Sequence, residues 1–229
     1  MPLLQDIINS NFHYQPIWVM ILITLSVILI GYLFSAFSGR FNEVIRSFFT
    51  MRYATQLARE EHSLTHPVSI LLSINYLLAC SLFILQLLSF KNIFSLQIDF
   101  SFVSLLAICA VIVLINLVKI VSIKLVAFIF DKPQLAGEYV FTVFLVNQMV
   151  GIALIPVVIF IAYGAPSWMN VFIYMGILLL ISGFCIRIGK GLLSAISGRA
   201  VTLFYLFLYL CTLEIIPLLV GFKLLENLV

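Results

Sequence analysis

Six long apolar stretches constrain this chain more than any other feature. They are bounded by charged residues, proline or glycine, and fall at about residues 16–38, 67–90, 101–123, 139–163, 168–187 and 200–222. A helix needs about 20 apolar residues to cross the hydrocarbon core of a bilayer. The composition, 64% hydrophobic and 9% charged over 229 residues, excludes an ordinary soluble domain. We therefore predict an all-α integral membrane protein, a single polytopic domain over residues 1–229 with about six transmembrane helices.

The cysteines and the start of the chain add little chemistry to this prediction. The four cysteines, Cys80, Cys109, Cys185 and Cys211, lie inside apolar stretches without CxxC spacing, so we interpret them as small hydrophobic residues. Residues 1–15 hold no Lys or Arg, whereas a cleavable signal peptide begins with a basic region. We therefore expect the first apolar stretch to be retained as a helix.

The basic residues predict the orientation of the chain. Of the 12 Lys and Arg residues, those after the first, third and fifth stretches are Arg40, Arg46, Arg52, Arg59, Lys119, Lys124, Lys132, Arg187, Lys190 and Arg199. The other side holds the remaining two, Lys91 and Lys223. Because cytoplasmic connections carry the excess of positive charge, we expect a bacterial inner-membrane protein with both termini in the periplasm. The charges are scattered and the formal net charge is only +3, so nucleic acid is not an expected partner.

The connection over residues 39–66 has the pattern of an amphipathic interfacial helix. Its apolar residues recur at helical spacing and are Phe41, Val44, Ile45, Phe48 and, less regularly, Met51. Its charged residues lie largely on other faces and include Arg46, Arg52, Arg59, Glu60 and Glu61. This division predicts a helix along the inner surface of the bilayer. Two interpretations remain open: an anchor that meets anionic lipid head groups, or a docking surface for other inner-membrane proteins.

Three asparagines lie at similar predicted depths in the membrane. Asn75, Asn116 and Asn147 each fall seven or eight residues from the cytoplasmic end of their stretch, which is about 10–12 Å at a rise of 1.5 Å per residue. Polar side chains in hydrocarbon are costly, so each is a functional candidate. They could form one polar layer that joins the second, third and fourth helices. Interhelical hydrogen bonds of about 1 kcal/mol each are the structural interpretation, and a water-filled pathway is the functional one.

Glu214 is the only carboxylate within a predicted span. Pro217 follows three residues later, so the carbonyl of Leu213 lacks its helical N–H donor. A carboxylate beside such a carbonyl could bind a proton or a sodium ion, as broken helices do in transporters. The structural alternative is a protonated Glu214 that donates a hydrogen bond to a neighbouring helix.

A membrane-embedded enzyme is the third alternative. His62 and His66 stand four residues apart and follow Glu60 and Glu61, so one helical face could offer two imidazoles to a metal. The HExxH order of a metallopeptidase is missing, and Pro67 follows at once. We therefore predict neither a metal site nor a cofactor.

The segment over residues 46–78, RSFFTMRYATQLAREEHSLTHPVSILLSINYLL, carries a family resemblance. It resembles a bacterial inner-membrane family from Bacteroidota catalogued as domain of unknown function 4271. Its recognisable part is the Arg-Tyr, Gln-Leu and Arg-Glu-Glu run that leads into the helix of Asn75. The resemblance implies an envelope protein and supplies no catalytic residues. A role in envelope biogenesis, such as assisting protein export, is an expectation by association.

The sequence as a whole favours a non-enzymatic protein. Our leading hypothesis is an accessory or scaffold subunit of a cell-envelope complex, because a basic amphipathic segment is present and a catalytic constellation is not apparent in the sequence. The alternative is a small ion-coupled transporter that uses Glu214 and the layer of Asn75, Asn116 and Asn147.

Overall fold

The computed structural model describes residues 16–49, 66–91, 101–129 and 133–197. These residues form α2 (Ile17–Ala36), α3 (Ser38–Phe49), α5 (Pro67–Lys91), α6 (Phe102–Ile129), α7 (Pro133–Tyr163) and α8 (Pro166–Ser197). Among them, five helices are long and apolar enough to cross a membrane, and only α3 is too short. The predicted all-α membrane fold is therefore confirmed. The sixth predicted span, residues 200–222, lies outside the described residues.

Proline and backbone geometry determine where these helices begin and end. Pro67 is the first residue of α5, where its missing N–H costs no hydrogen bond. At Phe37 the backbone leaves the helical region (φ −131°, ψ 41°), so α2 ends at Ala36 and α3 starts as a separate helix at Ser38. The first predicted span, residues 16–38, therefore extends two residues beyond the helix. Pro156 lies inside α7, which continues to Tyr163.

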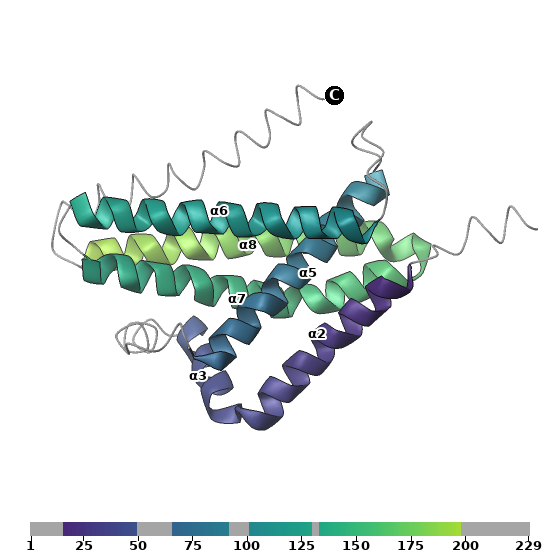
Figure 1. Cartoon of the computed structure of the whole chain (residues 1–229), viewed down its shortest axis with the longest axis horizontal. Helices are drawn as coiled ribbons and strands as arrows, with labels where there is room; N and C mark the ends of the chain where they lie inside the picture. The colour runs from purple at the N-terminus through teal and green to yellow at the C-terminus, as the bar shows by residue number, and fades with distance from the viewer. Residues whose placement is uncertain (1–15, 50–65, 92–100, 130–132, 198–229) are drawn as a thin grey trace, which may run out of the picture.

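Helix α7 is the centre of the bundle. It contacts each of the other five described helices, and its contact with α5 is the most extensive. Figure 1 shows α6, α7 and α8 running along the long axis, while α5 crosses them obliquely and α3 connects the end of α2 to the bundle. In the most apolar part of α5 and of α7, 56% of the residues are buried inside the bundle, whereas in the most apolar part of α6 only 11% are buried. The interior of the described bundle is thus built mainly from α5 and α7.

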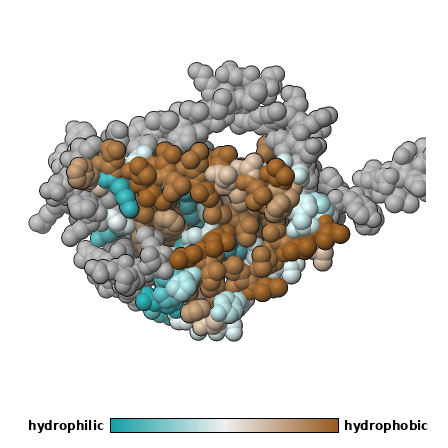
Figure 2. Space-filling model, viewed as in Figure 1, coloured by the Kyte–Doolittle hydropathy of each residue, from teal (hydrophilic) through white to brown (hydrophobic). Residues whose placement is uncertain are grey.

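The outer surface of the long helices is apolar. Side chains such as Ile17 on α2 (79% exposed) and Val103 on α6 (72% exposed) have no cover within the described bundle. Figure 2 shows this hydrophobic surface over α2 and α6, with hydrophilic residues near α3 and toward the left end of α6. Lipid tails are as apolar as Leu side chains, so a bilayer accommodates such a surface without cost.

Three apolar clusters fill the interior of the described bundle, and the smallest, Ile123, Ala127 and Val140, joins α6 to α7. Of the other two, the first, which we call the α3 cluster, lies where α3 meets the bundle and consists of Leu33, Phe41, Val44, Val68, Leu72, Phe141 and Leu145. The second, the central cluster, joins α2, α5, α7 and α8 and includes Ile23, Ala79, Leu82, Leu154 and Ile173. We use the term α3 end for the end of the bundle that holds the α3 cluster.

Along α2, α5 and α7, buried polar residues lie between the members of the α3 cluster and those of the central cluster. Ser26 lies between Ile23 and Leu33 on α2, Asn75 lies between Leu72 and Ala79 on α5, and Asn147 and Gln148 lie between Leu145 and Leu154 on α7. We call Ser26, Asn75, Asn147 and Gln148 the polar layer. Burying polar atoms costs free energy, so the packing of apolar side chains alone does not account for these four residues.

Candidate functional site

Two glutamines hold α5 and α7 together from opposite directions. Gln148 on α7 is 2% exposed, and its Nε2 donates to the Ser69 carbonyl oxygen (3.0 Å), the Ser69 hydroxyl (2.8 Å) and the Ser73 hydroxyl (3.2 Å) on α5. Further along, Gln86 on α5 donates from Nε2 to the carbonyl oxygen of Val158 on α7 (3.3 Å). Interhelical hydrogen bonds of this kind fix the register of two apolar helices that would otherwise slide.

Asn147 connects α7 to α8. Its side-chain oxygen accepts a hydrogen bond from Nη2 of Arg187, which lies within the apolar span of α8. Asn147 is 7% exposed, so this bond lies inside the bundle. A charged residue within a span is a functional candidate by default, and Arg187 therefore belongs with the polar layer.

Asn75 and Ser26 are buried without a visible hydrogen-bond partner. Among the described residues, neither the Nδ2 nor the Oδ1 of Asn75 has a partner, and the same holds for the hydroxyl of Ser26. Asn75 is 0% exposed and Ser26 3% exposed. A buried polar group without a partner costs about 1–3 kcal/mol. Each of the two residues therefore has unused hydrogen-bonding capacity among the described residues, which a water molecule could satisfy.

The three predicted asparagines differ in their surroundings and hydrogen bonds. Asn75 and Asn147 both lie in the polar layer, whereas Nδ2 of Asn116 donates to the carbonyl oxygen of Ile112 in its own helix, α6 (2.8 Å). Within the described ranges, the hydrogen bonds of Asn116 and Asn147 do not join the asparagines to one another. Gln148 and Ser26 were not predicted from the sequence as members of the layer, and Arg187 entered only the prediction of orientation.

The remaining predicted site residues are distributed as follows. Arg46 is exposed on α3. Those outside the described residues are Glu214, Arg52, Arg59, Glu60, Glu61 and His62. Within the described residues, His, Cys, Asp and Glu do not form a group of three that could hold a metal ion.

Helix α3 is attached to the bundle by two separate sets of contacts. Its residues Phe41 and Val44 are buried in the α3 cluster, so the apolar face of α3 packs on the bundle, while residues 50–65 of the predicted amphipathic segment lie outside the described residues. At its far end, Nζ of Lys190 on α8 donates to the carbonyl oxygen of Phe48 (2.6 Å) and lies 4.7 Å from the centroid of the Phe48 ring. A cation at the last carbonyls of a helix interacts favourably with the helix dipole, and a cation over a ring adds to this attraction. The two sets of contacts attach both the apolar face and the C-terminal end of α3 to the bundle.

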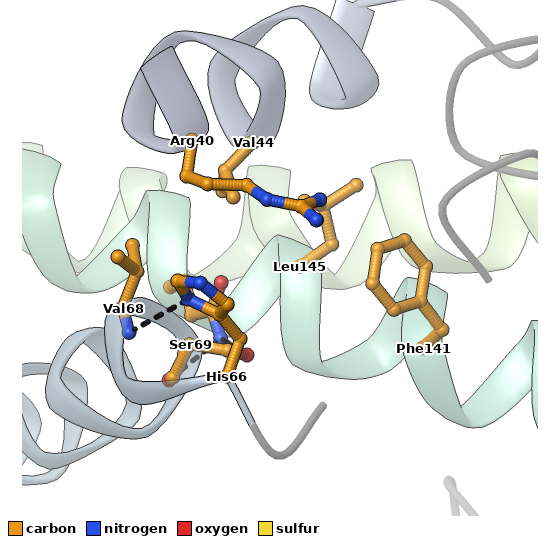
Figure 3. A pocket seen from close by; sticks show the side chains of 8 residues that line it. Arg40, Val44, His66, Val68, Ser69, Phe141 and Leu145 are labelled. Carbon is orange, nitrogen blue, oxygen red and sulfur yellow. Dashed lines mark hydrogen bonds between the residues drawn. The ribbon is translucent and has the colours of Figure 1, made fainter. Parts of the chain in front are cut away.

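A small cavity of about 20 Å³ lies between α3, the start of α5 and α7. Figure 3 shows Arg40 reaching over it from α3, with His66 on the α5 side. Its lining consists of Arg40, Val44, His66, Val68, Ser69, Phe141, Leu145 and Gln148. Arg40 forms an ion pair with Glu43 (Nη1 to Oε2, 3.2 Å), and Nδ1 of His66 accepts the N–H of Val68 (3.3 Å). The cavity can therefore hold a small group that accepts hydrogen bonds.

Comparison with known proteins gives one match. The model of a family described as Domain of unknown function (DUF4271) matches residues 19–225, which confirms the resemblance carried by residues 46–78. The match includes all of α3, α5, α6, α7 and α8 and all but the first two residues of α2. Neither a curated protein nor a solved structure matches the chain.

Proposed function

Since the chain belongs to the family described as Domain of unknown function (DUF4271), whose description names no activity, we propose a function from the geometry: a non-enzymatic scaffold or accessory subunit of a complex in the bacterial inner membrane. The observation that carries this proposal is the fixed attachment of α3. A helix whose apolar face is buried in the bundle and whose end is bound by Lys190 presents its polar face in a constant position. Such a surface suits the docking of another protein.

The outward face of α3 has the composition of a docking surface. Asn42, Glu43 and Arg46 are exposed on it, and Arg40 is paired with Glu43 beside them. Mixed charges favour specificity between partners more than raw affinity. The partner we propose is a membrane protein or membrane-associated protein of the cell envelope, with protein export as one such process.

We place α3 on the cytoplasmic side, with both termini in the periplasm. Support comes from the basic residues of the sequence, including Arg40, Arg46 and Lys190 at the α3 end. The test is a single cysteine in a variant whose native cysteines are replaced by alanine. A cysteine at exposed Asn42 should react with a membrane-impermeant maleimide only in inverted vesicles, and one at exposed Ser167 only in intact spheroplasts. The opposite labelling pattern would reverse the orientation.

Site-specific crosslinking tests the scaffold proposal. A photo-crosslinking amino acid at Asn42 should capture one partner in constant stoichiometry from native membranes, and Arg46→Glu should abolish that capture. The matched control is the same amino acid at Val111, an exposed apolar residue of α6, which should not capture this partner. A monodisperse monomer at native expression, with the same crosslinks from both positions, would contradict the proposal.

Ion-coupled transport is the second candidate, and the unpartnered amide of Asn75 favours it. A buried amide and the Ser26 hydroxyl could contribute oxygen ligands to a cation or a water-filled path. Glu214 would supply the titratable group. Proteoliposomes should then show an ion flux that both Asn75→Leu and Glu214→Gln abolish. Unchanged flux in both variants would exclude this candidate.

A further inference from the structure

The lining of the cavity at the α3 end is of two chemical kinds. Four lining residues are polar and four are apolar: Arg40, His66, Ser69 and Gln148, and Val44, Val68, Phe141 and Leu145. A membrane lipid has the same division, with a charged head group beside acyl chains. In the orientation proposed above, the cavity faces the cytoplasmic leaflet, whose anionic lipids attract basic residues.

The polar lining residues include hydrogen-bond donors. The guanidinium of Arg40 is a planar fork of N–H donors with the geometry to bind phosphate oxygens, and its Nη1 donates to Oε2 of Glu43, so a bound phosphate would share this donor with Glu43. Since Nδ1 of His66 accepts the N–H of Val68, the proton of its neutral imidazole resides on Nε2, which is then a second donor. Figure 3 shows these two side chains approaching the cavity from different elements, Arg40 from α3 and His66 from the start of α5.

The size of the cavity limits what enters it. A volume of about 20 Å³ accommodates one oxygen-sized group. One oxygen of a phosphate fits this space, while the rest of the head group remains at the cavity mouth beneath Arg40. The side chain of Arg40, 41% accessible, lines the cavity from α3. A free phosphate ion would make the same polar contacts, and the position of the cavity at the proposed cytoplasmic leaflet favours a lipid as the source of the phosphate.

We propose that this cavity binds the phosphate of an anionic membrane lipid, with Arg40 and His66 as the donors. The bound lipid bridges α3 and α5, two elements that are joined in sequence through residues 50–65. It therefore adds a third attachment for α3, besides the α3 cluster and Lys190. This inference rests on the proposed orientation and defines one ligand of the proposed scaffold.

Lipid-dependent thermal stability of the full-length purified protein tests the proposal. Phosphatidylglycerol added to the detergent-solubilised protein should raise its Tm, and phosphatidylcholine should not. Arg40→Gln should weaken the apparent affinity for phosphatidylglycerol by about 10-fold or more, because charge-assisted hydrogen bonds are lost. The matched control is Arg46→Gln on the same helix, outside the cavity, which should retain the wild-type affinity.

Three outcomes would overturn the proposal. Equal losses in Arg40→Gln and Arg46→Gln would mean a general attraction between a basic surface and anionic lipid. An equal Tm shift with inorganic phosphate, removed by Arg40→Gln, would mean a site for a soluble anion. If Arg40→Gln does not fold, Arg40→Lys takes its place, since it keeps the charge and loses the planar fork. An unchanged affinity in Arg40→Lys would contradict recognition of the phosphate by the guanidinium of Arg40. Loss of partner crosslinking with intact lipid binding would count against the scaffold function alone.

Discussion

The guanidinium of Arg187 on α8 donates a hydrogen bond to the side-chain oxygen of Asn147 on α7. This bond joins a charged residue within an apolar span to the polar layer. A charge in hydrocarbon is tolerated when it faces the interior of the bundle and is hydrogen-bonded. Arg187 and Asn147 thus connect α8 to the same layer that connects α7 to α5.

Replacing Asn147 should destabilise the bundle. We expect Asn147→Ala to lower the free energy of unfolding by about 1.5–3 kcal/mol, because a hydrogen bond to a charged group is lost while the guanidinium remains in the bundle. Unfolding in SDS titrations of the detergent-solubilised protein measures the loss. The control is Asn116→Ala, where only a bond within α6 is removed and the expected loss is below about 1 kcal/mol. Equal losses in the two variants would contradict the role of Asn147.

Gly151 permits the close approach of α5 and α7. A β-carbon at Gly151 would lie 2.6 Å from the Cα of Tyr76, which is backbone and cannot rotate away. We expect Gly151→Ala to push the helices apart and to destabilise the protein by about 1–3 kcal/mol in the same titration. Gly31→Ala is the control, since a β-carbon there meets nothing within 4 Å. A wild-type midpoint for Gly151→Ala would show that this approach is not required.

Asn75→Leu should stabilise the protein. Leu keeps the branch at Cγ and removes the two buried polar atoms that have no partner among the described residues, so we expect a gain of about 1–3 kcal/mol. Gln148→Leu should do the opposite, since it removes three contacts to α5. A destabilised Asn75→Leu variant would mean that water or a cation satisfies the amide, which would favour the transport candidate.

Lys190→Met should loosen α3. The variant removes both the hydrogen bond to the Phe48 carbonyl and the contact with the Phe48 ring. Because a charge-assisted bond contributes about 1.5–3 kcal/mol, hydrogen exchange of the amides in residues 38–48 should accelerate about 10-fold or more if it occurs by local opening. Lys124→Met, at an exposed lysine of α6, should leave this exchange unchanged. Equal acceleration in both variants would contradict a specific attachment.

The sequence predicts the helices well because their signals are local. A run of about 20 apolar residues is sufficient to indicate a span, and the predicted stretches over 67–90 and 139–163 correspond to helices Pro67–Lys91 and Pro133–Tyr163. The predicted start of this helix, residue 139, lies six residues after the observed start at Pro133, because residues 133–138 are more polar than the span that follows. Helical spacing likewise identified Phe41 and Val44 as the apolar face of α3.

The polar layer was only partly predictable, because distance along a helix gives depth and not direction. Asn116 and Asn147 have similar predicted depths, yet one bonds its own helix and the other reaches α8. Apolar helices show no polar face that would indicate which side is buried. Gln148 directly follows Asn147 and so points about 100° away on the helix, toward α5. Only the packing of α5, α7 and α8 reveals which of these side chains meet.

The unequal lengths of the helices have a consequence for the surrounding bilayer. At 1.5 Å per residue the apolar span of α2, with 20 residues, is about 30 Å long, whereas that of α7, Gly137–Tyr163 with 27 residues, is about 40 Å long. Parallel helices of these lengths would not both match a hydrocarbon layer about 30 Å thick. Figure 1 shows α2 at an oblique angle to α7, so a tilt that shortens the projection of α7 across this layer need not shorten that of α2 to the same extent. The bundle can thereby avoid the hydrophobic mismatch that parallel helices would impose on neighbouring lipids.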